Sequence, residues 1–310
     1  VTAPAVVSTS CAEPVLNVDT PTPLRPAISD GNGGTDTAEI GITVAGTALP
    51  LGEAGSLDVT QDSATQWHSV LFAEMIVDPI VVLGPVTTND DDPVTVRVRN
   101  VSDSGFEFQL DEYDYLDGVH GEESVSWLAI ARGNHTLSNG LSLVADTSSA
   151  ESGSFTSVSF GSSLLDPVVL HQVSSVNDAD AVSSRVRSVD GTGFEAELRE
   201  QEAGTSHAAE TLSWIAIESG TGGGIEVGRS GDAVGHAADA FVFNEAFAEA
   251  PVLLGDIQTR DGRDTSTLRL SAQSSTGFEA YIDEEQSSDT EINHTNEIIG
   301  WLALEDGLIY

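Results

Sequence analysis

The sequence predicts an all-β fold of three tandem six-stranded antiparallel β-sandwiches, and a threefold internal repeat is the first observation behind this prediction. Each copy contains a Gly-Phe pair and, further on, a tryptophan: Gly105-Phe106 with Trp127, Gly193-Phe194 with Trp214, and Gly277-Phe278 with Trp301. The second observation is that apolar and polar residues alternate between turns spaced about 8 to 12 residues apart, which is typical of sandwich strands with one face in solvent. A repeat that contains several strands indicates a small domain and not one turn of a thin solenoid.

The repeat divides the chain into a leader and three domains. We expect an extended leader over 1–45 and sandwiches over 46–133, 134–221 and 222–310, a size that is usual for a domain. The leader is rich in Pro, Thr and Ala, and it contains one alternating strand at Glu39–Val44 behind a glycine-rich turn. The segment DGNGGTDT in that turn resembles the closing hairpin of cadherin-like and Ig-like tandem domains of surface adhesins.

The strands of the first repeat follow from its alternation. Residues 67–72 alternate, 79–86 form a nearly continuous apolar run that opens on a proline, and 94–98 alternate again. A turn at 102–105 leads into the alternating strand 106–110, and 124–131 closes the copy. The second and third repeats place their strands at 155–160, 167–173, 184–189, 194–200 and 211–217, and at 241–243, 251–257, 267–271, 278–284 and 298–304. We expect short links at 132–139 and 219–224, and three copies that pack side by side with pseudo-threefold symmetry.

Charge and composition exclude several classes of partner. The 310 residues have a net charge of -39, from 50 acidic residues against 11 basic ones that are all arginine. Nucleic-acid phosphates would be repelled, and the acidity is typical of adaptation to high salt, where charges are screened over about 3 Å at 1 M. Cys11 is the single cysteine, so the cores must hold by packing. No apolar run is long enough for a membrane span, and the start at Val1 favours a processed or excised, exported product.

The repeat unit resembles the H-type lectin family. The resemblance covers all three repeats and depends on a strand that ends in Phe72, Phe160 or Phe243, the Pro-Val-Val strand, the Gly-Phe start of the next strand, and the closing Ser-Trp-Leu/Ile-Ala-Ile. It implies six-stranded sandwiches that assemble as trimers and bind N-acetylgalactosamine or related sugars between protomers. The family's aromatic-His pair falls on Tyr113-Asp114, Gln201-Glu202 and Glu285-Gln286, and its sugar-contacting arginine on Pro93, Ala181 and Thr265, so that sugar site is absent here.

Two polar loops recur in place of the family site. The loop before the last strand of each copy contains an imidazole and two carboxylates, which can accept hydrogen bonds from sugar hydroxyls, bind a cation or line a threefold axis. Together with one aromatic residue, the candidate ligand-binding residues are Glu112, Tyr113, His120, Glu123, Glu200, His207, Glu210, Glu284, His294 and Glu297. The alternative is a solvated loop in which the histidine caps a strand.

The loop between the third and fourth strands of each copy contains clustered oxygens that suit Ca²⁺, although plain turn chemistry explains them equally well. Its candidate metal ligands are Asp90, Asp91, Asp178, Asp180, Asp261 and Asp264. The arginines on the neighbouring strand are expected to form cross-strand ion pairs with the next strand. These arginines are Arg97, Arg99, Arg185, Arg187 and Arg269.

Two functions follow from these patterns. The first is an extracellular, multivalent carbohydrate-binding or adhesive module, whose partners are glycans or a cell-surface polysaccharide. The second is a structural subunit of a surface layer, appendage or virion, whose partners are neighbouring subunits or the rest of a larger surface protein. No nucleophile motif, phosphate loop or catalytic carboxylate pair is present, so we expect no enzyme, and no cofactor other than Ca²⁺.

Overall fold

A computed structural model describes residues 27–29, 35–37, 49–204 and 206–310 of the chain. The chain divides into two compact units, Val1–Ala48 and Leu49–Tyr310. In the first unit, β1 (Ala27–Ser29) pairs with β2 (Thr35–Thr37) as an antiparallel ladder. The strand predicted at Glu39–Val44 lies outside the described residues.

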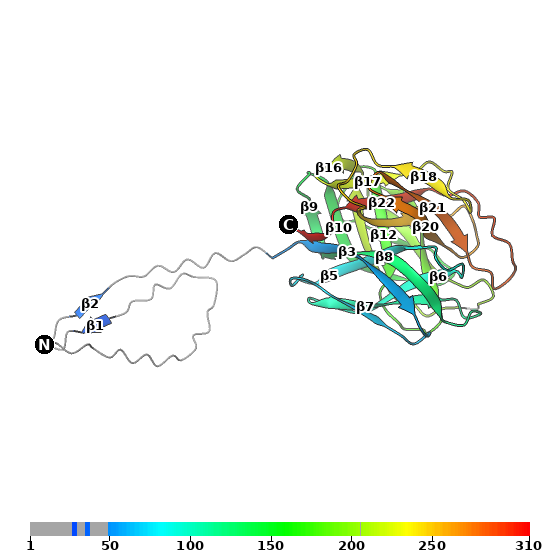
Figure 1. The fold of residues 1–310 in the computed structure, drawn as a ribbon, viewed down its shortest axis with the longest axis horizontal. Coiled ribbons are helices and arrows are strands. Elements are labelled where there is room, and N and C mark those ends of the chain that lie inside the picture. Colours follow the sequence, from blue (N-terminus) through cyan, green and yellow to red (C-terminus); the bar gives the residue numbers. More distant parts are fainter. Residues whose placement is uncertain (1–26, 30–34, 38–48, 205) are drawn as a thin grey trace. The chain divides into compact units, whose positions relative to one another are not determined.

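The second unit is built of strands, as predicted, and its described residues contain no helix long and apolar enough to cross a membrane. Figure 1 shows these strands. The first repeat contributes β3 (Gly52–Gln61), β4 (His68–Leu71), β5 (Pro79–Thr87), β6 (Val94–Ser102), β7 (Gly105–Glu112), β8 (His120–Ala131) and β9 (Gly133–Thr136). The second contributes β10 (Ser142–Ala150), β11 (Thr156–Ser159), β12 (Pro167–Val173), β13 (Val182–Asp190), β14 (Gly193–Glu200), β15 (Glu210–Glu218) and β16 (Gly220–Gly222). The third contributes β17 (Ile225–Arg229), β18 (Asp239–Val242), β19 (Val252–Ile257), β20 (Ser266–Ser274), β21 (Gly277–Glu284), β22 (Ile299–Leu304) and β23 (Gly307–Ile309).

The same strand pairing recurs in every repeat. The last long strand pairs with the first and third strands, giving β3-β8-β5, β10-β15-β12 and β17-β22-β19. The fifth strand pairs with the second and fourth, giving β4-β7-β6, β11-β14-β13 and β18-β21-β20. Within each repeat all of these ladders are antiparallel. The predicted all-β class is therefore confirmed, with antiparallel pairing inside each repeat, and a short parallel ladder joins β20 of the third repeat to β5 of the first.

The two segments expected to be links are strands that join one repeat to the next. Strand β9 pairs with β10, and β16 pairs with β17. The last strand, β23, pairs with β3, so that Ile309 lies opposite Gly52. Each repeat thus donates an edge strand to its successor, and the third repeat donates one to the first. The proposed repeat boundaries at 133 and 221 fall inside β9 and β16, and residues 49–310 form one compact unit.

The hydrophobic core has a shared part and three local parts. The shared cluster combines residues from all three repeats, among them Ile80, Leu170 and Leu254. Each local cluster lies between the two sheets of one repeat and contains its tryptophan, as Trp127 does in the first. Strand β5 therefore faces a core on both sides, which explains its nearly continuous apolar sequence.

Candidate functional site

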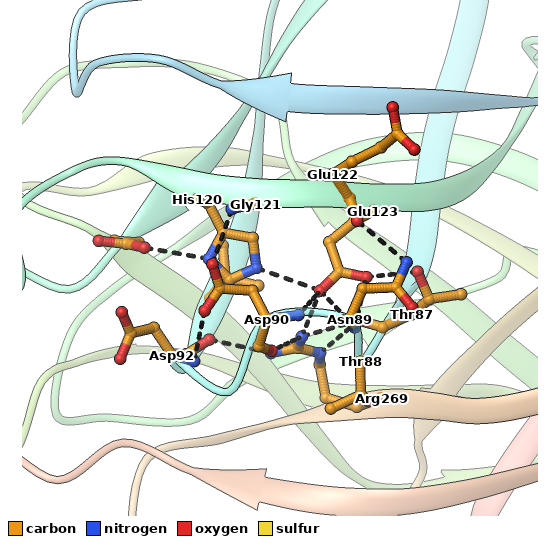
Figure 2. A network of polar contacts seen from close by, with 12 residues as sticks. Thr87, Thr88, Asn89, Asp90, Asp92, His120, Gly121, Glu122, Glu123 and Arg269 are labelled. Carbon is orange, nitrogen blue, oxygen red and sulfur yellow. Dashed lines mark hydrogen bonds and ion pairs between the residues drawn. The ribbon is translucent and has the colours of Figure 1, made fainter.

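The candidate residues of the first repeat form a buried network at the start of β8 (Figure 2). The Nδ1 atom of His120 lies 3.0 Å from a carboxylate oxygen of Glu112 at the end of β7, and Nε2 lies 3.4 Å from Glu123. Glu123 and His120 are both 0% exposed. The imidazole therefore bridges two carboxylates away from solvent.

Glu123 also organises the loop between β5 and β6. Its carboxylate accepts hydrogen bonds from the backbone N–H groups of Asn89 and Asp90, at 2.9 Å each, and from the hydroxyl of Thr87. A further donor comes from another repeat, because a guanidinium nitrogen of Arg269 on β20 lies 3.1 Å from the same carboxylate. Arg269 is itself 0% exposed, so this ion pair is fully buried between two repeats.

The same arrangement, here called a clasp, occurs three times in cyclic order. A clasp consists of a His-x-x-Glu pair, the second carboxylate that contacts the histidine, and the arginine of the preceding repeat. The clasps are Glu112, His120 and Glu123 with Arg269; Glu200, His207 and Glu210 with Arg97; and Glu284, His294 and Glu297 with Arg185. The arginine to glutamate distances are 3.1, 3.1 and 2.8 Å. The first repeat thus holds the second, the second the third, and the third the first.

Burial and pairing act against one another on these groups. Burial by itself would raise the pKa of Glu123, but hydrogen bonds from His120, Thr87 and the backbone hold that pKa below its usual value. Burial likewise opposes ionisation of Glu297, yet His294, Arg185 and Thr259 together lower its pKa to about 2. For His120 burial lowers the pKa, and the two neighbouring carboxylates more than offset this and raise it. When His120 is protonated, it and Arg269 together match the charge of the two carboxylates, which offsets the cost of burying them.

The clasps place the candidate ligand-binding residues away from solvent. The three glutamates that meet an arginine are at most 1% exposed, and the three histidines at most 6%. The predicted solvated loop is therefore wrong for these side chains, because their polar atoms face one another and the arginine of the preceding repeat. Tyr113 is also buried, at 2% exposure. A sugar would need an exposed face, and these side chains do not provide one.

The arginines expected to pair across a hairpin divide into two groups. Arg99 and Arg187 do form the predicted ion pairs, with Glu107 at 2.7 Å and with Glu195 at 2.8 Å. The three clasp arginines reach into the next repeat, but two of them also pair with a carboxylate on the next strand of their own hairpin, Arg97 with Asp111 at 3.6 Å and Arg269 with Asp283 at 3.2 Å. The prediction is therefore wrong only for Arg185, whose carboxylate partner lies in the next repeat.

The candidate metal loops lie beside the clasps. Asp91, Asp180 and Asp261 are exposed, whereas Asp90, Asp178 and Asp264 are half-buried. Ligand atoms of Asp178, Glu200 and His207 lie within 4.8 Å of one another, as do those of Asp264, Glu284 and Glu291. In the first group both imidazole nitrogens already contact carboxylates, at 3.1 Å. The Ca²⁺ site at these loops stays a prediction.

The sequence contained a signal for the clasp arginines that alternation alone does not explain. Each arginine lies within the buried part of β6, β13 or β20: Arg97 stands between Val96 and Val98, Arg269 between Leu268 and Leu270, and Arg185 directly before Val186. A charge at an aligned position in three buried strands requires a buried partner. The partner could not be read from local spacing because it lies about a full repeat or more away.

Fold and site together define an all-β protein whose repeated sandwiches are joined in a ring by donated strands and buried ion pairs. The chain is similar to a protein named halomucin from Haloquadratum walsbyi, with 27% identity over 289 residues. The match covers 88% of this chain and 3% of halomucin, so the chain spans a small part of that relative's length. No family model and no solved structure matches the chain.

Proposed function

We propose that this chain is a rigid structural module of a large extracellular protein adapted to high salt. The observation that supports this most directly is the burial of the three clasps. Polar groups that recur in every repeat would be the natural ligand sites of a multivalent lectin, but here they hold the repeats together. The similarity to a segment of halomucin and the net charge of -39 support a place in a much longer protein of a salt-loving organism.

The physical role of the module is to keep a fixed shape in brine. Surface ion pairs contribute little where salt screens charges over a few ångströms, whereas buried pairs are screened much less. The clasps and the shared apolar core therefore keep the three repeats in register at molar salt. We expect no catalytic role and no membrane span, and neighbouring segments or subunits as partners.

A glycan array probed at molar salt, with and without Ca²⁺, tests this proposal. We expect no saturable binding to any glycan in either condition. The proposal would be overturned by saturable binding to a glycan on the array that free sugar, added as a competitor, displaces. A radius of gyration from X-ray scattering that stays constant between low and molar salt would further support a rigid module.

Multivalent glycan binding is the second candidate, and one observation favours it. A half-buried aromatic ring precedes β4 and β11, and each is covered by an arginine, 3.9 Å from the ring of Trp67 and 3.8 Å from that of Phe155. Aromatic faces with nearby polar groups are common in ligand sites. Alanine at Trp67 and at Phe155 would abolish array binding in this case, and would leave the clasps intact.

A further inference from the structure

A small cavity lies at the centre of the ring. Its volume is about 70 Å³, and equivalent strands of all three repeats line it, namely β5 and β6, β12 and β13, and β19 and β20. Because one water needs about 10–15 Å³ of such volume, the cavity has room for several water molecules. It is distinct from the clasps, although Arg185 contributes to its lining.

The repeats differ in what they place at this cavity. On the third strand of each repeat, the residues opposite the tryptophan that recurs in the neighbouring strand are Leu83, His171 and Gly255. The second repeat therefore has an imidazole where the first has an aliphatic side chain and the third has none. The residue after Gly255 is Asp256, which also lines the cavity. The pseudo-symmetry of the ring is thus broken by one imidazole and one carboxylate that face each other.

The contacts of His171 leave one nitrogen free for a ligand. The residue is 6% exposed, and its Nδ1 lies 2.8 Å from the hydroxyl oxygen of Ser184. Its Nε2 has no hydrogen-bond partner and lies 3.8 Å from a carboxylate oxygen of Asp256. The other carboxylate oxygen accepts the backbone N–H of His171 at 2.9 Å, which fixes the carboxylate beside the ring.

Neutral imidazole is the form that binds metals. Burial lowers the pKa of His171 to about 4, against a smaller opposing contribution from the Ile257 carbonyl. If Nδ1–H donates to the Ser184 hydroxyl, the lone pair on Nε2 faces Asp256, and the hydroxyl oxygen serves as the hydrogen-bond acceptor that orients the imidazole for a metal. The carboxylate of Asp256 is partly buried, with 23% of its side chain exposed, and it faces an uncharged imidazole, so a positive ion between the two groups would stabilise both.

We propose that Nε2 of His171 and the carboxylate of Asp256 bind one divalent transition-metal ion, of the Zn²⁺ or Co²⁺ type, in this central cavity. Metal to ligand distances of about 2.0 to 2.2 Å at a tetrahedral angle separate two ligand atoms by about 3.4 Å, so the observed 3.8 Å closes with a small rotation. The remaining positions are filled by water, for which the cavity has room. Mixed imidazole and carboxylate ligands favour such metals over Mg²⁺ and Ca²⁺.

The test uses the whole chain, stripped of metal with a chelator and kept in molar KCl with excess Mg²⁺ to occupy surface carboxylates. Titration with Zn²⁺ by calorimetry should give one ion per chain, and Co²⁺ should give visible absorption bands from nitrogen coordination. His171→Leu, which installs the residue type of Leu83, should abolish both signals. Ser184→Ala should weaken binding about tenfold or more, as loss of a supporting contact usually does.

Two further variants make the outcome decisive. His236→Ala removes an exposed imidazole and should leave the stoichiometry and affinity unchanged. If His171→Leu fails to fold, Asp256→Asn makes the same test, because it retains an acceptor for the His171 backbone N–H. The proposal is overturned by the absence of saturable Zn²⁺ binding, by three ions per chain, or by binding that neither variant weakens.

Discussion

The energy of a clasp can be measured against an exposed ion pair two residues away on the same strand. Arg185 on β13 contacts Glu297 at 2.8 Å, and their side chains are 2% and 0% exposed. Arg187 contacts Glu195 at the same 2.8 Å, with side chains that are 45% and 31% exposed. The two pairs differ in burial and in the repeats they join, which makes Arg187→Met the matched control for Arg185→Met.

The expected losses of unfolding free energy differ several-fold between Arg185→Met and Arg187→Met. At 2.8 Å and an effective dielectric constant of about 20, two unit charges attract by about 6 kcal/mol, and desolvation offsets part of this. Removal of Arg185 leaves the Glu297 charge buried, so we expect a loss of about 3–5 kcal/mol of unfolding free energy. Removal of Arg187 should cost about 0.2–1 kcal/mol.

The assay is urea denaturation at one fixed molar salt concentration, followed by intrinsic tryptophan fluorescence. The double variant Arg185→Met with Glu297→Gln should lose less than the sum of the two single variants, because no unpaired buried charge remains. Equal losses for Arg185→Met and Arg187→Met would refute the reasoning. So would strictly additive losses in the double variant.

Three further outcomes can be measured on the same protein. With a net charge of -39, the thermal midpoint should rise between about 0.01 M and 1 M salt as the screening length falls from about 30 to 3 Å, and a flat profile would contradict this. Deletion of β23 (Gly307–Ile309) should speed amide exchange in its partner β3 around Gly52 but leave β17 protected, and unchanged exchange would show that the ladder is dispensable. Glu297 has a folded pKa of about 2 against an ordinary 4.5, so its contribution to stability should fade as the pH falls from 4.5 to 2. The pKa of His120 is raised, so its contribution should fade as the pH rises beyond 6.5. Stability measured against pH for Glu297→Gln and His120→Gln should therefore differ from that of the parent, and profiles that match the parent would contradict these assignments.

The fold was predictable from local patterns, whereas the joints between repeats were not. Alternation located strands such as Val94–Ser102, and the apolar run from Pro79 located a strand with a core on both faces. The edge strands Gly133–Thr136 and Gly220–Gly222 were read as links because short, polar, glycine-containing segments have no strand signature of their own. Their strand character arises from backbone pairing with the next repeat, which is a tertiary effect.

The candidate site was predictable in its residue types but not in its role. The recurrence of His-x-x-Glu singled out the right side chains, such as His120 and Glu123. Whether such side chains face solvent or a neighbouring repeat depends on the assembly of the ring, because their arginine partners lie on other repeats. The imidazole of His171 escaped the pattern altogether, since it occurs in one repeat and not in three.

The pairing of β23 with β3 also determines how the module responds to a mechanical load. Ile309 lies opposite Gly52, and the backbone N–H of Leu51 donates to Ile309 at 2.7 Å, so the two ends of residues 49–310 emerge side by side (Figure 1). A pull applied at Leu49 and Tyr310 therefore peels this three-residue ladder bond by bond and does not shear it as a block. We expect the ring to open there at low force, releasing a short length of chain while β9 and β16 still hold the repeats in line.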